Sequence, residues 1–232
     1  MQATHFVDSA GHKIAVHAIE GEGPAILWIP GHKSVMTGGS KSEPLLTFCR
    51  QKGYRFVGFD YAGWGQSGDT QQKWDVDTWT GNIVDVIDSL PNEKVILVGC
   101  SMGGYLMLLA QQARPEKVCG LFGVCPGFGD YVNKTGRREV AYKNITLPLD
   151  YISDPVPHHI ITKPIIVDVP LYILGSATDE KVPAPTFHNM LRMVQSPQAE
   201  IHLTPDGDHY FKRPQDIELF LEKLDAFRQR CL

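Results

Sequence analysis

A serine stands between glycines directly after a continuous apolar run. Residues 94–98 read Lys-Val-Ile-Leu-Val, and residues 99–103 read Gly-Cys-Ser-Met-Gly, the pattern G-x-S-x-G around Ser101. An apolar run of this kind is typical of a strand buried on both faces, and the residues after Ser101 have a helical pattern up to Ala113, before Pro115. The pattern therefore predicts a tight strand-to-helix turn that exposes a nucleophilic serine hydroxyl.

The rest of the chain repeats this alternation of short apolar runs with helical patterns. The predicted strands are residues 13–19, 25–30, 54–60, 94–100, 118–125, 169–175 and 199–204. Apolar residues recur at helical spacing in 76–90, 102–113 and 214–227. Strands that alternate with helices indicate an α/β fold with a mainly parallel central sheet flanked by helices. We expect residues 1–232 to form a single domain.

Composition excludes several partners. The chain has 232 residues, 43% of them hydrophobic, and a net charge of −4 with acids and bases interspersed. No basic block favours nucleic acid, and no apolar run approaches the roughly 20 residues of a membrane span. The five cysteines form no C-x-x-C pair, which favours reduced intracellular thiols. We expect a cytoplasmic protein, or a mitochondrial one if a leader was removed; the sequence leaves the oligomeric state open.

A serine nucleophile needs a base, and the base needs an orienting carboxylate. The expected chain order on this fold is serine, acid, histidine. Asp179 follows the predicted strand 169–175, and His209 follows the strand 199–204. Both therefore lie at the same sheet edge as Ser101. Glu180 remains a rival acid, and Asp206 and Asp208 are weaker candidates.

Attack by the serine creates an oxyanion, which needs preorganised donors. The backbone amide of Met102, directly after the nucleophile, is one candidate. The other is the amide of His32, in the loop after the strand 25–30. Trp64 and Tyr105 are candidate substrate-binding residues, although each is also a plausible core residue.

Residues 127–165 interrupt the alternation of strand and helix patterns, because they are rich in Pro, Gly, Tyr and His and show little periodicity. A loop this long in a compact domain is typically functional, and we expect a short lid over the serine. Its many apolar residues can wall an acyl slot or only pack the lid onto the domain.

Other signals carry less weight. Gly63 to Gly68 match G-x-G-x-x-G, but no helix pattern opens there, which argues against a dinucleotide. The nine histidines form no HExxH or H-x-H cluster, so we expect no metal. Cys100, before the serine, is expected to be a small buried residue and not the nucleophile.

The loop "PGHK", the segment "FDYAGWGQSG", and the motifs "GCSMGG", "GSATDEKVP" and "GDHY" together resemble the α/β-hydrolase superfamily over nearly the whole chain. "RPEKV" after the nucleophile helix is similar to the compact serine hydrolases of the acyl-protein thioesterase (depalmitoylase) and acyl-glucuronide esterase type. The resemblance implies ester or thioester substrates, no metal and no organic cofactor. Two positions depart from it: Pro30 stands where many members have His, and Asp179 lies one residue further from Gly175 than usual.

The leading hypothesis is a serine hydrolase that cleaves carboxylic esters or thioesters through an acyl-enzyme on Ser101. One alternative keeps the fold and changes the reaction to carbon–carbon bond or peptide hydrolysis. Another is a non-catalytic ligand receptor on the same fold, which turnover would distinguish. A dehalogenase or an epoxide hydrolase would need Asp at position 101.

Overall fold

The computed structural model describes residues 1–36, 38–68, 76–90, 94–127, 139–142, 145–148 and 164–232. One sheet of eight strands dominates it, in the order β1-β2-β4-β3-β5-β6-β10-β12. The strands span His5–Ser9 (β1), His12–Ile19 (β2), Tyr54–Phe59 (β4), Glu22–Ile29 (β3), Val95–Cys100 (β5), Val118–Val124 (β6), Leu171–Ser176 (β10) and Ala199–Thr204 (β12). The β1–β2 and β2–β4 pairs are antiparallel, and every other pair in this sheet is parallel.

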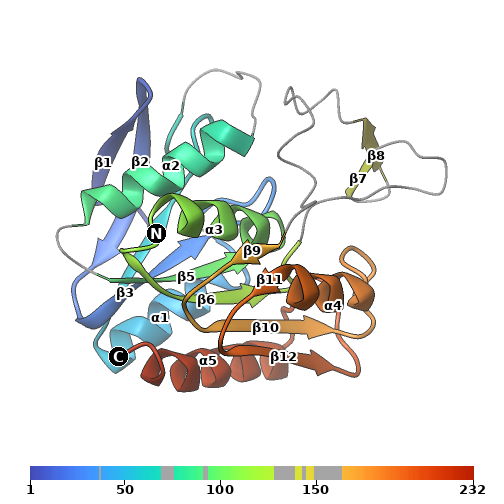
Figure 1. Ribbon diagram of the computed structural model, residues 1–232. Helices are drawn as coiled ribbons and strands as arrows, with labels where there is room; N and C mark the ends of the chain where they lie inside the picture. Colours follow the sequence, from blue (N-terminus) through green and yellow to red (C-terminus); the bar gives the residue numbers. More distant parts are fainter. Residues whose placement is uncertain (37, 69–75, 91–93, 128–138, 143–144, 149–163) are drawn as a thin grey trace.

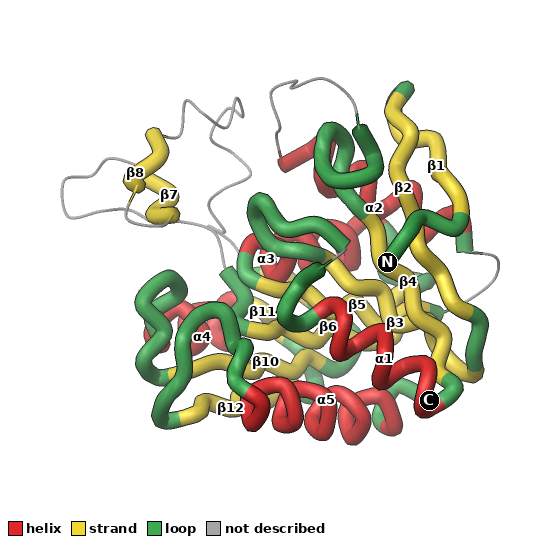
Figure 2. The backbone as a smooth tube through the Cα atoms, turned by 180° about the vertical axis from the view of Figure 1, so that it is seen from behind, coloured by secondary structure: helices red, strands yellow, loops and turns green. Residues whose placement is uncertain are grey.

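The described residues include five helices, which cover the sheet. Figures 1 and 2 show this arrangement from opposite sides. They are α1 (Ser42–Lys52), α2 (Val76–Ser89), α3 (Met102–Ala113), α4 (Ala184–Met193) and α5 (Pro214–Gln229). Apolar side chains of α2, α3 and α4 form one core with one face of the sheet, while those of α1 and α5 form a second core with the other face. A sheet covered on both faces explains the continuous apolar runs of its strands.

Alternate residues of one strand enter the two cores. In β5, Val95 and Leu97 pack toward α2 and α3, whereas Ile96 and Val98 pack toward α1 and α5. This division follows the two-residue period of a strand. The arrowheads of β6, β10 and β12 point the same way in Figure 1, so the loops after them meet at one edge.

All seven predicted strands and all three predicted helices are present, with ends shifted by up to three residues. Sequence reasoning missed β1, α1 and α4. β1 is an exposed edge strand with a burial pattern too weak to stand out. α1 buries Leu45, Leu46 and Cys49 and ends at Gly53, which adopts φ 69°, a left-handed cap that suits glycine.

Two short strand pairs lie outside the main sheet in the described part of the chain. β9 (Ile165–Ile166) pairs with β11 (Val194–Gln195) in parallel, and β7 (Glu139–Tyr142) pairs with β8 (Ile145–Pro148) antiparallel. Most of the predicted lid, at residues 128–138, 143–144 and 149–163, lies outside the described residues. The single domain with a lid over 127–165 therefore stays a prediction.

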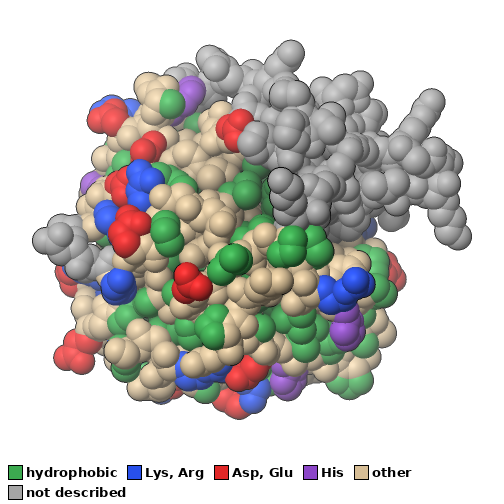
Figure 3. Space-filling model, in the orientation of Figure 1, with side chains coloured by type: hydrophobic (Ala, Val, Ile, Leu, Met, Phe, Trp, Pro, Cys, Tyr) green, Lys and Arg blue, Asp and Glu red, His purple; other side chains and the backbone are tan. Residues whose placement is uncertain are grey.

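On the face in Figure 3, positive and negative side chains are interspersed with hydrophobic ones, in keeping with the small net charge. Among the described helices, none is long and apolar enough to cross a bilayer.

Candidate active site

Ser101 lies at the turn between β5 and α3. Its φ of 52° and ψ of −122° are unusual for a residue with a side chain, so the turn is strained. A Cβ on Gly99 would lie 2.4 Å from the carbonyl oxygen of Gly103, and one on Gly103 would lie 2.3 Å from that of Ile29. Only glycine allows the strand and the helix to approach this closely, which is why the serine stands between glycines.

The structure brings Ser101, His209 and Asp179 together. The Ser101 Oγ lies 3.0 Å from the His209 Nε2, and the His209 Nδ1 lies 2.8 Å from the Asp179 Oδ2. The Asp179 side chain is fully buried, whereas 13% of the His209 side chain remains exposed. With a proton on Nδ1, the imidazole donates to the carboxylate and its Nε2 is free to accept the serine proton.

The Asp179 carboxylate is held by the loop after β10. Its Oδ1 accepts the backbone N–H groups of Lys181 at 2.7 Å and Val182 at 2.8 Å. Burial by itself raises the pKa of Asp179, but the hydrogen bond and charge of His209 and the two amides outweigh it, so the pKa is lowered. Glu180 is exposed. The geometry therefore favours Asp179 over Glu180 as the acid.

His209 lies in a loop tied to the end of β10. The carbonyl oxygen of Gly207 accepts the hydroxyls of Ser176 at 2.9 Å and Thr178 at 3.0 Å. Asp206 pairs with Arg213 at 2.8 Å, and the Asp208 Oδ1 accepts the Phe211 N–H at 3.0 Å. The two weaker acid candidates thus shape this loop.

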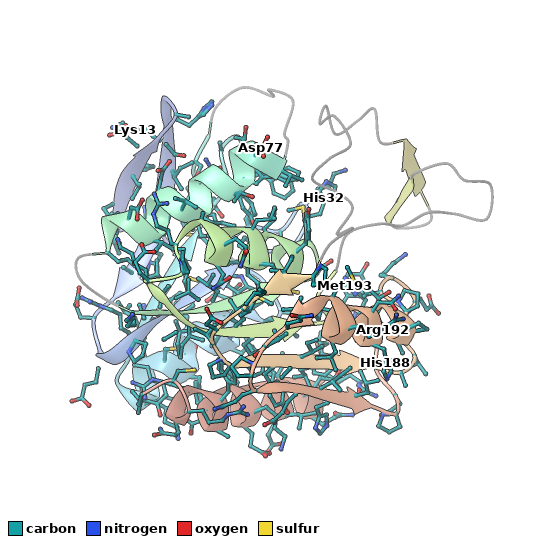
Figure 4. The ribbon with its side chains drawn as sticks, in the orientation of Figure 1. Lys13, His32, Asp77, His188, Arg192 and Met193 are labelled. Carbon is teal, nitrogen blue, oxygen red and sulfur yellow. The ribbon has the colours of Figure 1, made fainter. Side chains whose placement is uncertain are left out.

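The loop after β3 packs against the serine. A Cβ on Gly31 would lie 3.1 Å from both the Ser101 Cβ and the Cys100 carbonyl oxygen. This contact places the next residue, His32, beside the start of α3, as Figure 4 shows. The amide of Met102 belongs to the first turn of that helix, where N–H groups point away from the helix. Both candidate oxyanion donors therefore lie next to Ser101.

The His32 side chain packs edge-on against two tryptophans. Its ring centroid lies 5.6 Å from that of Trp64 and 6.3 Å from that of Trp79. Burial, with a smaller effect of the Lys33 charge, lowers the pKa of His32 to about 4, so the ring is neutral at pH 7. Trp64 and Tyr105 are only 5% and 6% exposed and belong to the same core. Their role in substrate binding stays a prediction, since both are packed like core residues.

Comparison with known proteins identifies the family to which this chain belongs. Residues 30–152 match the family model of the alpha/beta hydrolase fold. The chain belongs to the α/β-hydrolase family. It is 32% identical over 231 residues to the mitochondrial palmitoyl-protein thioesterase ABHD10 of Pongo abelii, and 31% identical over 231 residues to that of Homo sapiens. Each match covers 91% of this chain and 75% of the relative. These matches confirm the predicted resemblance and the predicted class of enzyme, a hydrolase.

A solved structure supports the same conclusion. The mouse alpha/beta hydrolase domain-containing protein 10 superposes with a TM-score of 0.86 at 28% identity and covers 98% of both chains. The curated relatives are named as mitochondrial. Their names do not support the expected cytoplasmic location, whereas the mitochondrial alternative fits them.

The structure accommodates both departures of this α/β hydrolase from the common pattern. The carbonyl oxygen of Pro30 accepts the Tyr61 hydroxyl at 3.0 Å, which holds the loop that leads to His32. After β10, the Ser176 Oγ accepts the Thr178 N–H at 3.1 Å, which shapes the turn that leads to Asp179.

Sequence reasoning missed two residues of the α/β-hydrolase site. Cys125, directly after β6, is buried near the Asp179 carboxylate, and burial raises the pKa of its thiol well above the usual range. Ligand atoms of Cys125, Asp179 and His209 lie within 4.8 Å of one another. Lys41 is buried, and its ammonium donates a hydrogen bond to the Tyr210 carbonyl, next to His209.

The one sequence signal for Cys125 is its position at the end of the predicted strand 118–125. Nothing in the local pattern around Lys41 marks it, because its partner lies 169 positions away.

Proposed function

We propose that this α/β hydrolase is a serine hydrolase of carboxylic esters and thioesters, with Ser101 as nucleophile, His209 as base and Asp179 as orienting acid. The observation that carries the proposal is the continuous chain of two short hydrogen bonds, 3.0 Å and 2.8 Å, that links a hydroxyl on a strained turn to a buried carboxylate. Serine is a weak nucleophile by itself, and this arrangement is the one that activates it.

The reaction follows from the positions of the groups. The Ser101 Oγ attacks the acyl carbonyl carbon while His209 Nε2 takes the hydroxyl proton, and the carbonyl oxygen becomes an oxyanion. The amides of Met102 and His32 stabilise that oxyanion. When the tetrahedral intermediate collapses, His209 returns the proton to the alcohol or thiol that leaves. Water, activated by His209, then releases the acid from the acyl-enzyme.

Asp179 stabilises the imidazolium that His209 becomes after each proton transfer. Its lowered pKa keeps the carboxylate charged at neutral pH. No step in this sequence needs a metal or an organic cofactor, and we propose that the enzyme uses neither.

A small acyl ester or thioester is the proposed substrate. The curated relatives are named palmitoyl-protein thioesterases, which favours a fatty S-acyl group over a peptide bond. The apolar residues in 127–165 are the proposed walls of the acyl slot. Each methylene buried there contributes about 0.8 kcal/mol, so catalytic efficiency should rise from acetyl into the medium-chain range.

The first test is labelling with a fluorophosphonate. The wild-type protein should be labelled, and Ser101→Ala should lose both the label and about 10⁴- to 10⁶-fold of turnover. Cys100→Ser is the matched control, because it changes the neighbouring residue and should retain most activity. An inactive Cys100 variant beside an active Ser101 variant would overturn the assignment.

The second test is a series of nitrophenyl esters and acyl thioesters of increasing chain length, with matched peptide amides beside them. A profile that is flat or falls from acetyl, or faster cleavage of amides than of esters, would contradict the substrate class. A protein that takes the label but turns over none of the esters would instead be a receptor.

A further inference from the structure

The five cysteines fall into two groups. Cys49, Cys100 and Cys125 are buried, and burial raises the pKa of each thiol, that of Cys49 to about 12. Cys119 and Cys231 are instead partly exposed. Because the thiolate is the reactive form, an oxidant should distinguish these two groups.

A β-bulge turns Cys119 toward the α5 side of the sheet. Val95 of β5 pairs with Val118 of β6, but the next residue, Ile96, pairs with Gly120, so Cys119 is the additional residue. A bulge changes the direction of its side chains. Val118 packs in the core under α2 and α3, whereas Cys119 packs against the core under α1 and α5.

Cys231 meets Cys119 at this bulge. It follows α5, and its Sγ lies where a side chain of Gly120 would be, since a Cβ there would be only 2.5 Å from that sulfur. The absence of a side chain at Gly120 therefore makes room for the Cys231 thiol. Both cysteines pack against the same core, under α1 and α5. Each also lies near a carbonyl oxygen: Cys119 Sγ is 3.4 Å from that of Val95, and Cys231 Sγ is 3.5 Å from that of Phe227.

The pair is electrostatically asymmetric. The neighbouring Cys231 thiol lowers the pKa of Cys119 although burial opposes it, and the charges of Lys94 and Arg228 act in the same direction as Cys231. The neighbouring Cys119 thiol and burial raise the pKa of Cys231, although the charges of Arg230 and Arg228 act in the opposite direction. Cys119 is therefore the thiol that ionises first, and Cys231 is the neighbour that can resolve an oxidised Cys119.

We propose that Cys119 and Cys231 are a redox-sensitive pair that forms a reversible intramolecular disulfide when the protein meets a hydroperoxide. The Cys119 thiolate attacks the terminal oxygen of the hydroperoxide and the O–O bond breaks. Hydroxide leaves from hydrogen peroxide, or alkoxide from an organic hydroperoxide, as Cys119 becomes a sulfenic acid. The Cys231 sulfur then attacks the Cys119 sulfur, and the S–O bond breaks with loss of water. With hydrogen peroxide, two thiols and one peroxide give one disulfide and two waters.

This pair is separate from the hydrolase site. Ser101 lies beside Val124, at the end of β6, and Cys119 lies five residues earlier, about 17 Å away along the strand. The C-terminus lies at the edge of the sheet opposite the arrowheads of the parallel strands (Figure 1). The proposal therefore does not depend on the identity of the acyl substrate.

The test treats the reduced full-length protein with a roughly tenfold excess of hydrogen peroxide, removes the peroxide with catalase and alkylates the remaining thiols. The intact protein should lose about 2 Da, bear two fewer alkyl groups than the reduced protein, and recover both after dithiothreitol. Trypsin should release residues 118–134 linked to residues 231–232. Because the disulfide closes a loop of more than a hundred residues, the oxidised protein should also unfold at a higher temperature.

Variants identify the pairing. Cys119→Ser and Cys231→Ser should each abolish the 2-Da loss, and Cys231→Ser should accumulate a sulfenic acid at Cys119 that dimedone traps. Cys49→Ala and Cys125→Ala should keep the loss. An unchanged mass after peroxide, a link to another cysteine, an intermolecular dimer, or a 2-Da loss that persists in Cys231→Ser would overturn the proposal.

Discussion

Replacing Asp179 by asparagine changes one oxygen of the site for an NH₂ group, and the structure dictates which one. The Oδ1 accepts two backbone N–H groups, from Lys181 and Val182, while the Oδ2 faces the His209 Nδ1. An asparagine keeps its carbonyl oxygen on the two amides and turns its NH₂ toward His209. The opposite orientation would leave two N–H groups facing an NH₂, at about 1–3 kcal/mol each.

The asparagine NH₂ can only donate to His209 Nδ1, so the proton of the imidazole must move to Nε2. That nitrogen then donates to the Ser101 hydroxyl, 3.0 Å away, and cannot accept its proton. We expect a loss of about 10⁴-fold in kcat, which is about 5.4 kcal/mol of transition-state stabilisation. The fold should survive, because the two side chains have the same shape.

The assay is the steady-state hydrolysis of a nitrophenyl ester at neutral pH, with circular dichroism to check the fold. Glu180→Gln is the matched control, because it makes the same chemical change at the adjacent, exposed position; it should change kcat by less than about twofold. A loss below about 10²-fold for Asp179→Asn, or a larger loss for Glu180→Gln, would refute the reasoning.

Three further predictions concern the surroundings of Ser101. The folded-state pKa of His32, about 4, lies below its ordinary value of 6.5, so the folded protein binds fewer protons than the unfolded one and its free energy of unfolding, intact above pH 6.5, should fall as the pH drops toward 4. In denaturant unfolding at both ends of this pH window, His32→Gln should remove about 1–2 kcal/mol of that loss, after allowance for partial exposure. An unchanged dependence of the free energy of unfolding on pH would contradict the assignment. Gly103→Ala places a Cβ 2.3 Å from a backbone oxygen and should lower the free energy of unfolding by about 1–3 kcal/mol or more. Gly81→Ala in α2 is the control, because nothing lies within 4 Å of its Cβ, and it should be neutral or stabilising. Equal effects of the two variants in a denaturant titration would refute the packing argument. Cys125→Ala removes a polar side chain near the acid and should lower kcat/KM roughly 3- to 10-fold, whereas Cys125→Ser, which keeps a polar group there, should restore most of it. Equal losses in the two variants would assign Cys125 a packing role alone.

The sequence by itself determined the parts of this protein that depend on neighbouring residues. The apolar run before Ser101, the glycines around it and the helical pattern after it are local, because a strand, a tight turn and a helix each require particular residues at short spacing. Each of Ser101, Asp179 and His209 directly follows a strand, β5, β10 or β12, so its place at a strand end is also a local feature. The strands carry these residues to one edge because parallel strands end together.

The tertiary structure decided what depends on contacts between distant parts of the chain. Asp179 rather than Glu180 faces His209, because the amides of Lys181 and Val182 hold the Asp179 carboxylate in the loop after β10. Lys41 reaches the Tyr210 carbonyl from the start of α1, and Cys119 meets Cys231 because a bulge in β6 turns it toward the end of α5. Such pairs leave no periodic trace in the sequence, because packing in three dimensions, and not spacing along the chain, brings them together.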